Sequence, residues 1–124
     1  VLVQRMGAAG IEMVVGLHRD PVFGGVVMAG LGGIHIEVLK DVVFRKVPIT
    51  LAEAARMLAD LKSTVILDGV RGSPAANRAA LNELVSAVSQ LGAAADGWME
   101  ELDLNPVLAG PDGVSAVDWL MICR

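Results

Sequence analysis

The chain has 124 residues, of which 54% are hydrophobic and 19% charged, a composition typical of one folded domain and not of a disordered segment. The net charge of −4 and the 3% aromatic content argue against a nucleic-acid-binding surface. No uncharged run is long enough to predict a membrane span. The mean hydropathy of +0.59 predicts that another domain or subunit covers part of the apolar surface.

The first half of the chain predicts short strands in an antiparallel meander. Asp20-Pro21 and Gly32-Gly33 separate these segments, and such short joints suit neighbouring antiparallel strands. The segments have apolar or alternating patterns and span residues 1–6, 11–17, 25–31, 34–39 and 42–47.

The middle of the chain predicts two helices. Thr50 and Glu53 match a capping box, and Leu51, Ala54, Ala55, Leu58 and Leu61 follow at helical spacing. A second helix is expected to begin at Ser73-Pro74 and to end at Gly92, with residues 67–72 as a loop between the two. Strands, two helices and two more strands predict an α+β domain, with both helices on one face of a largely antiparallel sheet.

The C-terminal part combines acidic and amide side chains with a predicted hairpin. Glu101, Asp103 and Asn105 alternate with leucines, so a strand places the three polar groups on one face. Residues 110–113 read as a tight turn, and the return strand, 114–122, carries Asp118. Carboxylate and amide oxygens on neighbouring strands suit a hard cation such as Mg²⁺.

Two registers of this hairpin are possible. A hairpin centred between Pro111 and Asp112 makes Asn105 and Asp118 direct cross-strand partners. A three-residue loop with a bulge at Gly113 shifts the pairing by one residue and sends the two side chains to opposite faces. The alternative to a metal site is an asparagine beside a turn and a solvated aspartate.

Several segments together resemble one family. They are Gly10-Ile11-Glu12-Met13-Val14-Val15-Gly16, Asp20-Pro21-Val22-Phe23-Gly24, Gly30-Leu31-Gly32-Gly33-Ile34 with Glu37, Lys40-Asp41-Val42-Val43-Phe44-Arg45, Gly69-Val70-Arg71-Gly72, and Glu101-Leu102-Asp103-Leu104-Asn105-Pro106 followed by Asp118. In this order and at this spacing they resemble the nucleotide-binding ATP-grasp part of NDP-forming acyl-CoA synthetases, which are related to the β subunit of succinyl-CoA synthetase.

The resemblance implies that residues 1–124 are the C-terminal part of an ATP-grasp domain. An N-terminal grasp subdomain and the CoA-binding and ligase domains, with their phosphate-carrying histidine, are then expected as partners, together with nucleotide. The implied reaction interconverts acyl-CoA, ADP and phosphate with acid, CoA and ATP. This chain alone is expected to be inactive, and the protein to form an oligomer.

The resemblance also implies roles for individual residues. Asn105 and Asp118 would bind Mg²⁺, with Asp103 in support, and Arg71 would contact a phosphate. The residues implied to contact ATP or ADP are Val3, Gln4 and Met6 at the purine hinge, then Glu12, Gly32, Gly33 and Glu37.

Some of these residues have simpler interpretations. The Gly30–Gly33 run could be a turn, Glu37 a solvated strand residue and Arg71 a helix cap. Trp98 and Trp119 are expected in the core or at an interface. Cys123, the only cysteine, is expected to pack in an apolar strand; it excludes an internal disulfide and suits a reducing cytoplasm.

Two other functions remain open at this stage. In one, the domain regulates a protein that carries a fused acetyltransferase, and binds nucleotide or CoA for that purpose. In the other, it is an oligomerisation domain that kept the fold without turnover. The chain begins with Val1 and has no signal peptide, so it is expected to be a piece of a longer protein.

Overall fold

The computed structural model describes residues 10–32, 41–69 and 74–124. Within these ranges the elements, in chain order, are β1 (Ile11–Asp20), β2 (Gly24–Leu31), β3 (Val42–Lys46), α2 (Leu51–Ala59), the 3₁₀ helix η1 (Thr64–Asp68), α3 (Arg78–Ala94), β4 (Met99–Gly110), β5 (Gly113–Ala116) and β6 (Trp119–Cys123). The predicted strands at 1–6 and 34–39 lie outside the described residues.

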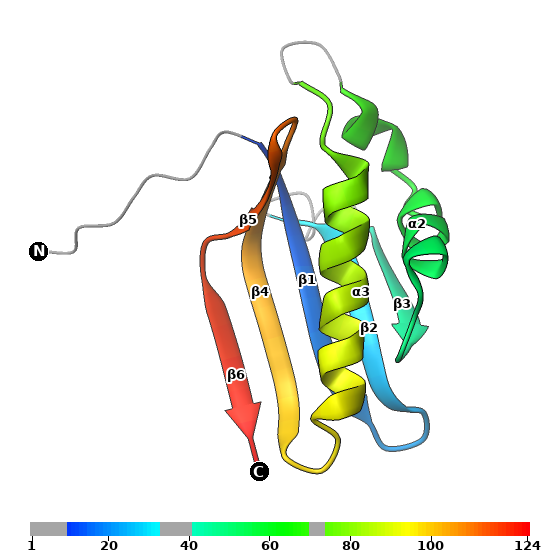
Figure 1. Cartoon of the computed structure of the whole chain (residues 1–124), viewed down its shortest axis with the longest axis vertical. Helices are drawn as coiled ribbons and strands as arrows, with labels where there is room; N and C mark the ends of the chain where they lie inside the picture. Colours follow the sequence, from blue (N-terminus) through cyan, green and yellow to red (C-terminus); the bar gives the residue numbers. More distant parts are fainter. Residues whose placement is uncertain (1–9, 33–40, 70–73) are drawn as a thin grey trace, which may run out of the picture.

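The strands form one antiparallel sheet in the order β3-β2-β1-β4-β5, and β6 pairs with β4 further along the same side as β5. Both α-helices lie on one face of this sheet, with α3 over β1 and β2 (Figure 1). The predicted α+β architecture is therefore confirmed.

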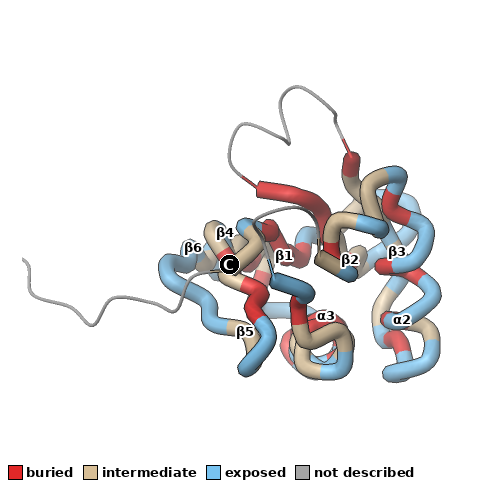
Figure 2. The backbone as a smooth tube through the Cα atoms, turned by 90° about the horizontal axis from the view of Figure 1, so that it is seen from above, coloured by how far each residue is buried: buried red, intermediate tan, exposed pale blue. Residues whose placement is uncertain are grey.

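Alternation along the central strands places the core between the sheet and the helices. Met13, Val15 and Leu17 of β1 are at most 2% exposed and pack in one cluster with residues of both helices. Buried residues concentrate along the central strands and on the inner side of α3 (Figure 2). The other face of the sheet has no helix on it among the described residues.

The helix α2 begins as predicted. The Thr50 side chain accepts a hydrogen bond from the Glu53 N–H at 3.1 Å, and the Glu53 carboxylate accepts one from the Thr50 N–H at 3.4 Å. The predicted apolar stripe is partly wrong, because Leu51 is 53% exposed and Ala55 is exposed as well. The buried face consists of Ala54, Met57, Leu58 and the following Leu61.

Both ends predicted for the second helix are wrong. The helix begins at Arg78, where the side chain of Asn77 accepts from the Ala80 N–H at 3.0 Å; Pro74 is not helical, and Ser73 lies outside the described residues. Gly92 lies inside the helix. A Cβ there would be 2.8 Å from Cδ2 of Leu17 and closer still to Cδ1, so glycine allows α3 to approach β1.

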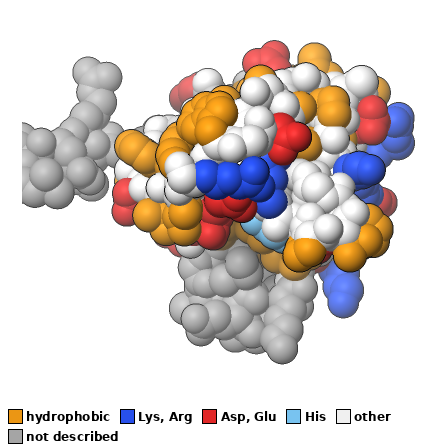
Figure 3. Space-filling model, turned by 90° about the horizontal axis from the view of Figure 1, so that it is seen from below, with side chains coloured by type: hydrophobic (Ala, Val, Ile, Leu, Met, Phe, Trp, Pro, Cys, Tyr) orange, Lys and Arg blue, Asp and Glu red, His pale blue; other side chains and the backbone are white. Residues whose placement is uncertain are grey.

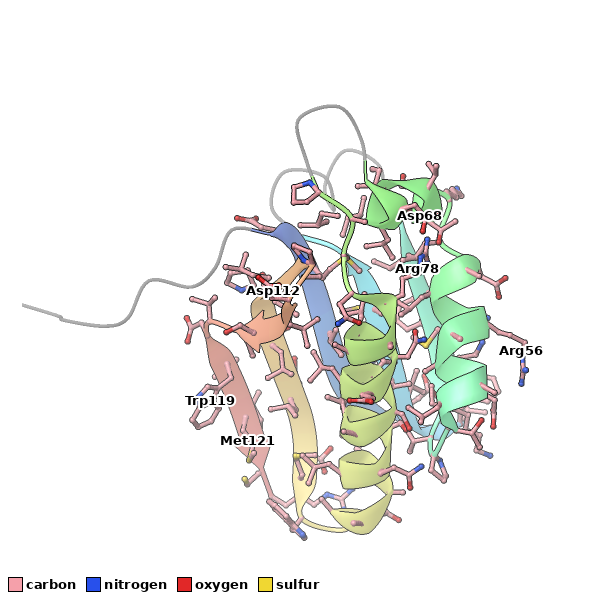
Figure 4. The ribbon with its side chains drawn as sticks, turned by 45° about the horizontal axis from the view of Figure 1, so that its top comes forward. Arg56, Asp68, Arg78, Asp112, Trp119 and Met121 are labelled. Carbon is pink, nitrogen blue, oxygen red and sulfur yellow. The ribbon has the colours of Figure 1, made fainter. Side chains whose placement is uncertain are left out.

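The segment between the helices is more ordered than the predicted loop. Thr64–Asp68 forms a 3₁₀ helix, and Arg78 joins it to α3 by donating to Asp68 at 2.8 Å and to the Thr64 carbonyl at 2.6 Å. The two side chains point toward one another (Figure 4). The Asp68 carboxylate accepts this hydrogen bond from Arg78, which lowers its pKa.

Cys123 was expected to pack in an apolar strand, and this is wrong because it is exposed. Trp98 is 50% and Trp119 66% exposed, so of the two places expected for them, the core is excluded and an interface stays a prediction. The end with the β1–β2 turn exposes Val22 and Phe23, but hydrophobic side chains there are interrupted by charged ones (Figure 3).

Among the described helices, none has the length and apolar character needed to cross a bilayer.

Candidate functional site

The sheet face away from the helices carries a strip of polar side chains on β4, flanked by smaller and apolar ones on β1 and β2. A groove of about 280 Å³ follows this strip. It is lined by Val14, Gly16, Leu17, His18, Met28, Glu101, Leu102, Asp103 and Asn105. The groove lies over three neighbouring strands, so the sheet holds its polar groups in fixed relative positions.

The β4–β5 hairpin adopts the first of the two predicted registers. Gly110 pairs with Gly113 across a two-residue turn, and the same register continues into β6, where Leu104 pairs with Trp119. Asn105 and Asp118 are therefore direct cross-strand neighbours. The Asn105 N–H donates to the Asp118 carbonyl at 3.2 Å.

A bulge in β4 accompanies this pair. Met13 pairs with Val107, but Val15 pairs with Leu104, so β4 has one more residue than β1 between these points. The bulge therefore consists of Asn105 and Pro106, two residues of β4 that lie opposite a single residue of β1. Bulges of this kind re-aim a side chain beside functional sites, and here Asn105 lines the groove together with Asp103.

Gly16 leaves space beside Asp103. The two residues pair across β1 and β4, and a Cβ on Gly16 would lie 3.9 Å from Oδ1 of Asp103 and 3.6 Å from Cε of Met28. The missing side chain therefore keeps the floor of the groove open between the carboxylate and the methionine.

The donor groups at this place suit a hard cation. Asn105 and Asp118 are exposed, and Asp103 is half-buried. Oδ1 of Asp118 accepts from the Trp119 N–H at 2.8 Å, which fixes the carboxylate and leaves Oδ2 for a ligand. Amide and carboxylate oxygens are the ligands that Mg²⁺ takes, and it commonly completes its shell with water and phosphate oxygens.

These side chains would supply only part of a metal shell. No group of three or more His, Cys, Asp or Glu side chains in residues 10–32, 41–69 and 74–124 is arranged to hold a metal ion. The donor set of Asn105, Asp103 and Asp118 therefore fits a cation that shares its coordination with a bound substrate better than a structural site such as zinc, which takes four protein ligands.

The predicted nucleotide-contacting residues are only partly described. The structure brings Glu12 and Gly32 together, because the Gly32 N–H donates to the Glu12 carbonyl at 2.8 Å. This hydrogen bond engages the Gly32 N–H within the sheet, so that N–H is not free to contact a nucleotide. The remaining candidates lie outside the described residues; they are Val3, Gln4, Met6, Gly33, Glu37 and Arg71.

His18 and Glu101 line the groove, although neither was predicted as a site residue. His18 is an exposed residue of β1 and lies opposite Glu101 of β4. Its ring is edge-on to Phe44, with 6.5 Å between ring centroids. Alternation in the sequence indicates that Glu101 shares a face with Asp103, and His18 with Gly16, but only the pairing of β1 with β4 brings the two strands' residues together.

Comparison with known proteins identifies the family of the chain. The ATP-grasp domain family matches residues 1–123. The subunit beta of ADP-forming acetate–CoA ligase I from Pyrococcus furiosus is 44% identical over 122 residues, which cover 98% of this chain and 52% of that subunit. ADP-forming acetate–CoA ligase I from Archaeoglobus fulgidus is also 44% identical over 122 residues, covering 98% and 18%.

Solved structures are similar over the same length. Ca. Korarchaeum cryptofilum ACD1 in complex with coenzyme A superposes with a TM-score of 0.92 at 36% identity, covering 98% of this chain and 53% of that one. A dinucleotide forming acetyl-coenzyme A synthetase 1 from the same organism, in complex with coenzyme A and Mg-AMPPCP, gives 0.88 at 36%, covering 95% and 55%.

The chain thus spans about half the length of the P. furiosus subunit and less than a fifth of the A. fulgidus ligase. The match over residues 1–123 and the shared sheet architecture confirm the resemblance seen in the sequence. The chain belongs to the ATP-grasp family.

Proposed function

We propose that this chain binds a Mg²⁺-nucleotide on the open face of its sheet, as the C-terminal part of the ATP-grasp domain of an ADP-forming acid–CoA ligase. The reaction of the whole protein would interconvert acyl-CoA, ADP and phosphate with acid, CoA and ATP. The names of relatives that are 44% identical over 98% of the chain support this reaction. A similar solved structure that contains coenzyme A and Mg-AMPPCP supports the ligands.

The observation that carries the proposal is the pairing of Asn105 with Asp118. Asn105 lines the groove with Asp103, and Asp118, between β5 and β6, lies opposite Asn105 in the register of the hairpin. Asn105 and Asp118 would hold the cation, and Asp103 would support them. When bound, Mg²⁺ neutralises charge on phosphate oxygens during phosphoryl transfer.

The rest of the strand positions this pair. Leu102 and Leu104 alternate with the polar residues and face the helices; Leu102 is buried and Leu104 packs partly against the core. Because these leucines anchor the inner face of β4, the strand cannot rotate without exposing them. Asp103 and Asn105 therefore stay directed at the groove.

A second subdomain would complete the site. The groove holds about 280 Å³ on an open sheet face, whereas small-molecule pockets of about 300–1,000 Å³ usually enclose most of the ligand. The N-terminal part of the ATP-grasp domain and the CoA-binding and ligase domains would supply the opposite wall and the acceptor groups.

The test is Asp118→Asn in the full-length protein, with Asp112→Asn as the matched control. Both changes remove one carboxylate charge with little change in shape, and both residues are exposed, but Asp112 lies in the β4–β5 turn (Figure 4). Asp118→Asn is expected to weaken Mg²⁺-dependent nucleotide binding at least tenfold, measured by calorimetry, with an unchanged circular dichroism spectrum. Asp112→Asn is expected to bind as the wild type does.

Equal Mg²⁺-nucleotide affinity in the wild type and Asp118→Asn would refute the assignment of this metal ligand. Binding that is weakened equally by both variants would point to a general loss of negative charge. A Mg²⁺ titration at a fixed nucleotide concentration distinguishes loss of a metal ligand from a general loss of negative charge. Only loss of a ligand raises the Mg²⁺ concentration needed for half-maximal binding.

A further inference from the structure

Gly16 lies in the interior of β1, the central strand of the sheet. A glycine in such a place weakens the strand, and it often marks a position where a ligand approaches the backbone closely. The φ angle of Gly16 is not positive, so its backbone conformation does not require glycine. Gly16 pairs with Asp103 of β4 on one side and with Met28 of β2 on the other, and all three residues line the groove.

Packing within the sheet explains the glycine at residue 16 less well than it explains Gly30 of β2. At Gly30, a Cβ atom would lie 2.8 Å from the Asp41 carbonyl oxygen, so the backbone itself excludes a side chain. At Gly16, the nearest atom to a Cβ would be the Leu102 carbonyl oxygen at 3.1 Å, and the next would be Cε of Met28 at 3.6 Å. A methyl group at residue 16 therefore needs only a small shift of the backbone, and the sheet alone does not account for glycine at this position.

The two neighbours of Asp103 on the outer face of the sheet differ in size. The strands β1 and β6 flank β4 (Figure 1). On the β1 side, Asp103 lies beside Gly16; on the β6 side, it lies beside Leu120, which is 55% exposed. A group that approaches the Asp103 carboxylate along the sheet therefore finds space over β1 and a leucine side chain over β6.

The space over Gly16 is small. A Cβ atom at this residue would be in ordinary van der Waals contact with Cε of Met28 at 3.6 Å and with Oδ1 of Asp103 at 3.9 Å. The gap between these two side chains therefore admits a group of about the size of a methyl group. A ribose or a purine ring does not fit into it, whereas an oxygen atom of a phosphate does.

The cation of the proposed function brings a phosphate to this gap. Under that proposal Asn105 and Asp118 hold Mg²⁺, and Asp103 supports them. Oxygen atoms bound to one Mg²⁺ lie side by side in its octahedral shell, so a phosphate on the same ion lies next to Asp103, where the free space is that over Gly16. In ATP the metal ion bridges oxygens of the β- and γ-phosphates, so one of these two phosphates lies there.

Of these two phosphates, the γ-phosphate suits the space over Gly16 better. Asn105 lines one end of the groove, which continues past Gly16 to His18 and Glu101. Phosphoryl transfer needs room for an acceptor beside the phosphate that is transferred, and the groove offers that room on the Gly16 side. The β-phosphate would then lie on the side of Asn105 and Asp118.

We propose that Gly16 is a specificity-determining residue of the nucleotide site. Its missing side chain leaves the space in which the γ-phosphate of a Mg²⁺-triphosphate lies against β1, beside Asp103. The inference rests on the proposed function and adds to it a discrimination between two nucleotides. A side chain at residue 16 would hinder the binding of a triphosphate but not that of a diphosphate, whose last phosphate does not reach Gly16.

The test measures the affinities of the full-length protein for Mg-ADP and for Mg-AMPPCP by calorimetry. AMPPCP is a triphosphate analogue with a methylene group between its β- and γ-phosphates, so it binds without transfer. Gly16→Ala is expected to weaken Mg-AMPPCP binding at least tenfold and to leave Mg-ADP binding nearly unchanged. A purely structural role of Gly16 would change both affinities by the same factor, so their ratio is the decisive measurement.

Gly25→Ala is the matched control. A Cβ atom at Gly25 of β2 would also be crowded, since it would lie 2.7 Å from Cγ2 of Val47, but Gly25 is not among the residues that line the groove. This variant is expected to unfold at a lower urea concentration than the wild type and to keep the wild-type ratio of the two affinities. The control thus separates a loss of stability from a loss of space for the γ-phosphate.

Met28→Phe provides a second variant, for use if Gly16→Ala does not fold. It narrows the same space from β2 without adding an atom beside the Leu102 carbonyl, and the same selective loss of Mg-AMPPCP affinity is expected. A folded variant that binds Mg-AMPPCP as the wild type does, or that loses affinity for both nucleotides by the same factor, would overturn the inference and leave the proposed function standing. A wild-type protein that binds neither nucleotide in a Mg²⁺-dependent way would refute the proposed function, and this inference with it.

Discussion

Asp41 is a carboxylate that is only 2% exposed. It accepts hydrogen bonds from the N–H groups of Lys62 at 2.8 Å and Ser63 at 2.7 Å. Burial alone would raise the pKa of Asp41, but these two N–H groups stabilise the charged form and the pKa lies below its ordinary value. One side chain thus fastens the start of β3 to the segment between α2 and η1.

Asp41→Asn is expected to lower the free energy of unfolding at pH 7 by about 1–3 kcal/mol, because a hydrogen bond to a charged group is lost in a buried place. The folded pKa is lower than the unfolded value of about 3.9, so the stabilisation is present above pH ~4 and is lost as the pH falls through the folded pKa. Urea unfolding at several pH values measures the difference between wild type and variant.

That difference should therefore narrow below pH ~4. Glu83→Gln, an exposed change on α3, is the control and is expected to stay within about 0.5 kcal/mol of the wild type. An Asp41→Asn variant as stable as the wild type at pH 7 would contradict this account of Asp41.

At the scale of elements, α3 connects the parts of the domain. Its Ser86 hydroxyl donates to the Ile49 carbonyl at 3.0 Å, and the Ser89 hydroxyl accepts from the Ile49 N–H at 3.0 Å. Near the C-terminal end of α3, the Gly92 carbonyl accepts a hydrogen bond at 2.8 Å from Arg19 of β1, which is partly buried. The helix therefore holds the segment before α2 and the strand β1 together.

Local signals predicted some elements well and others badly. The capping box of α2 was visible because Thr50 and Glu53 interact within one turn. Gly92 was wrongly predicted to end the helix because a glycine is needed there for a tertiary contact: it makes room for Leu17 of β1. The start of α3 was misplaced because Ser73-Pro74 is as good a local start signal as Asn77, and packing decides between them.

Asn77→Ala is expected to destabilise the domain by about 1 kcal/mol, because the first turn of α3 loses the side-chain acceptor for the Ala80 N–H. Asn77→Asp keeps an acceptor and adds a charge that suits a helix N-terminus, so it should remain close to the wild type. Chemical denaturation of the three proteins measures both effects. If Asn77→Ala is as stable as the wild type, the hydrogen bond from the Ala80 N–H to the Asn77 side chain does not stabilise the start of α3.

In the candidate site too, features set by local sequence were predicted and features set by long-range pairing were not. Alternation placed Glu101, Asp103 and Asn105 on one face correctly, because strand periodicity is local. The sequence left the pairing of Asn105 with Asp118 open between two registers, because a single residue in the turn decides it. His18 was missed as a groove residue because its neighbour Glu101 is more than 80 residues away in the chain and comes beside it only through the pairing of β1 with β4.

At the scale of the whole molecule, the two faces of the sheet have different environments. The inner face packs against α2 and α3 in one core, whereas the outer face carries the polar groove and has no helix on it among the described residues (Figure 2). The acidic strip of β4 therefore lies at the surface. A reaction that transfers a phosphoryl group needs water excluded and an acceptor positioned, and an open face provides neither.

We therefore expect the 124-residue chain, purified alone, to show no acid- and CoA-dependent turnover of ATP. The chain covers 52% of the P. furiosus subunit, and under the proposed function the remainder supplies the opposite wall and the phosphate acceptor. Coupled detection of ADP release measures turnover, with the full-length protein as the positive control. Adding the remaining part as a separate polypeptide should restore activity in the wild-type chain but much less in Asp118→Asn, because only the latter lacks a cation ligand. Mg²⁺-dependent turnover by the 124 residues alone would show that the open face is sufficient, and would contradict the proposed division of the site between two subdomains.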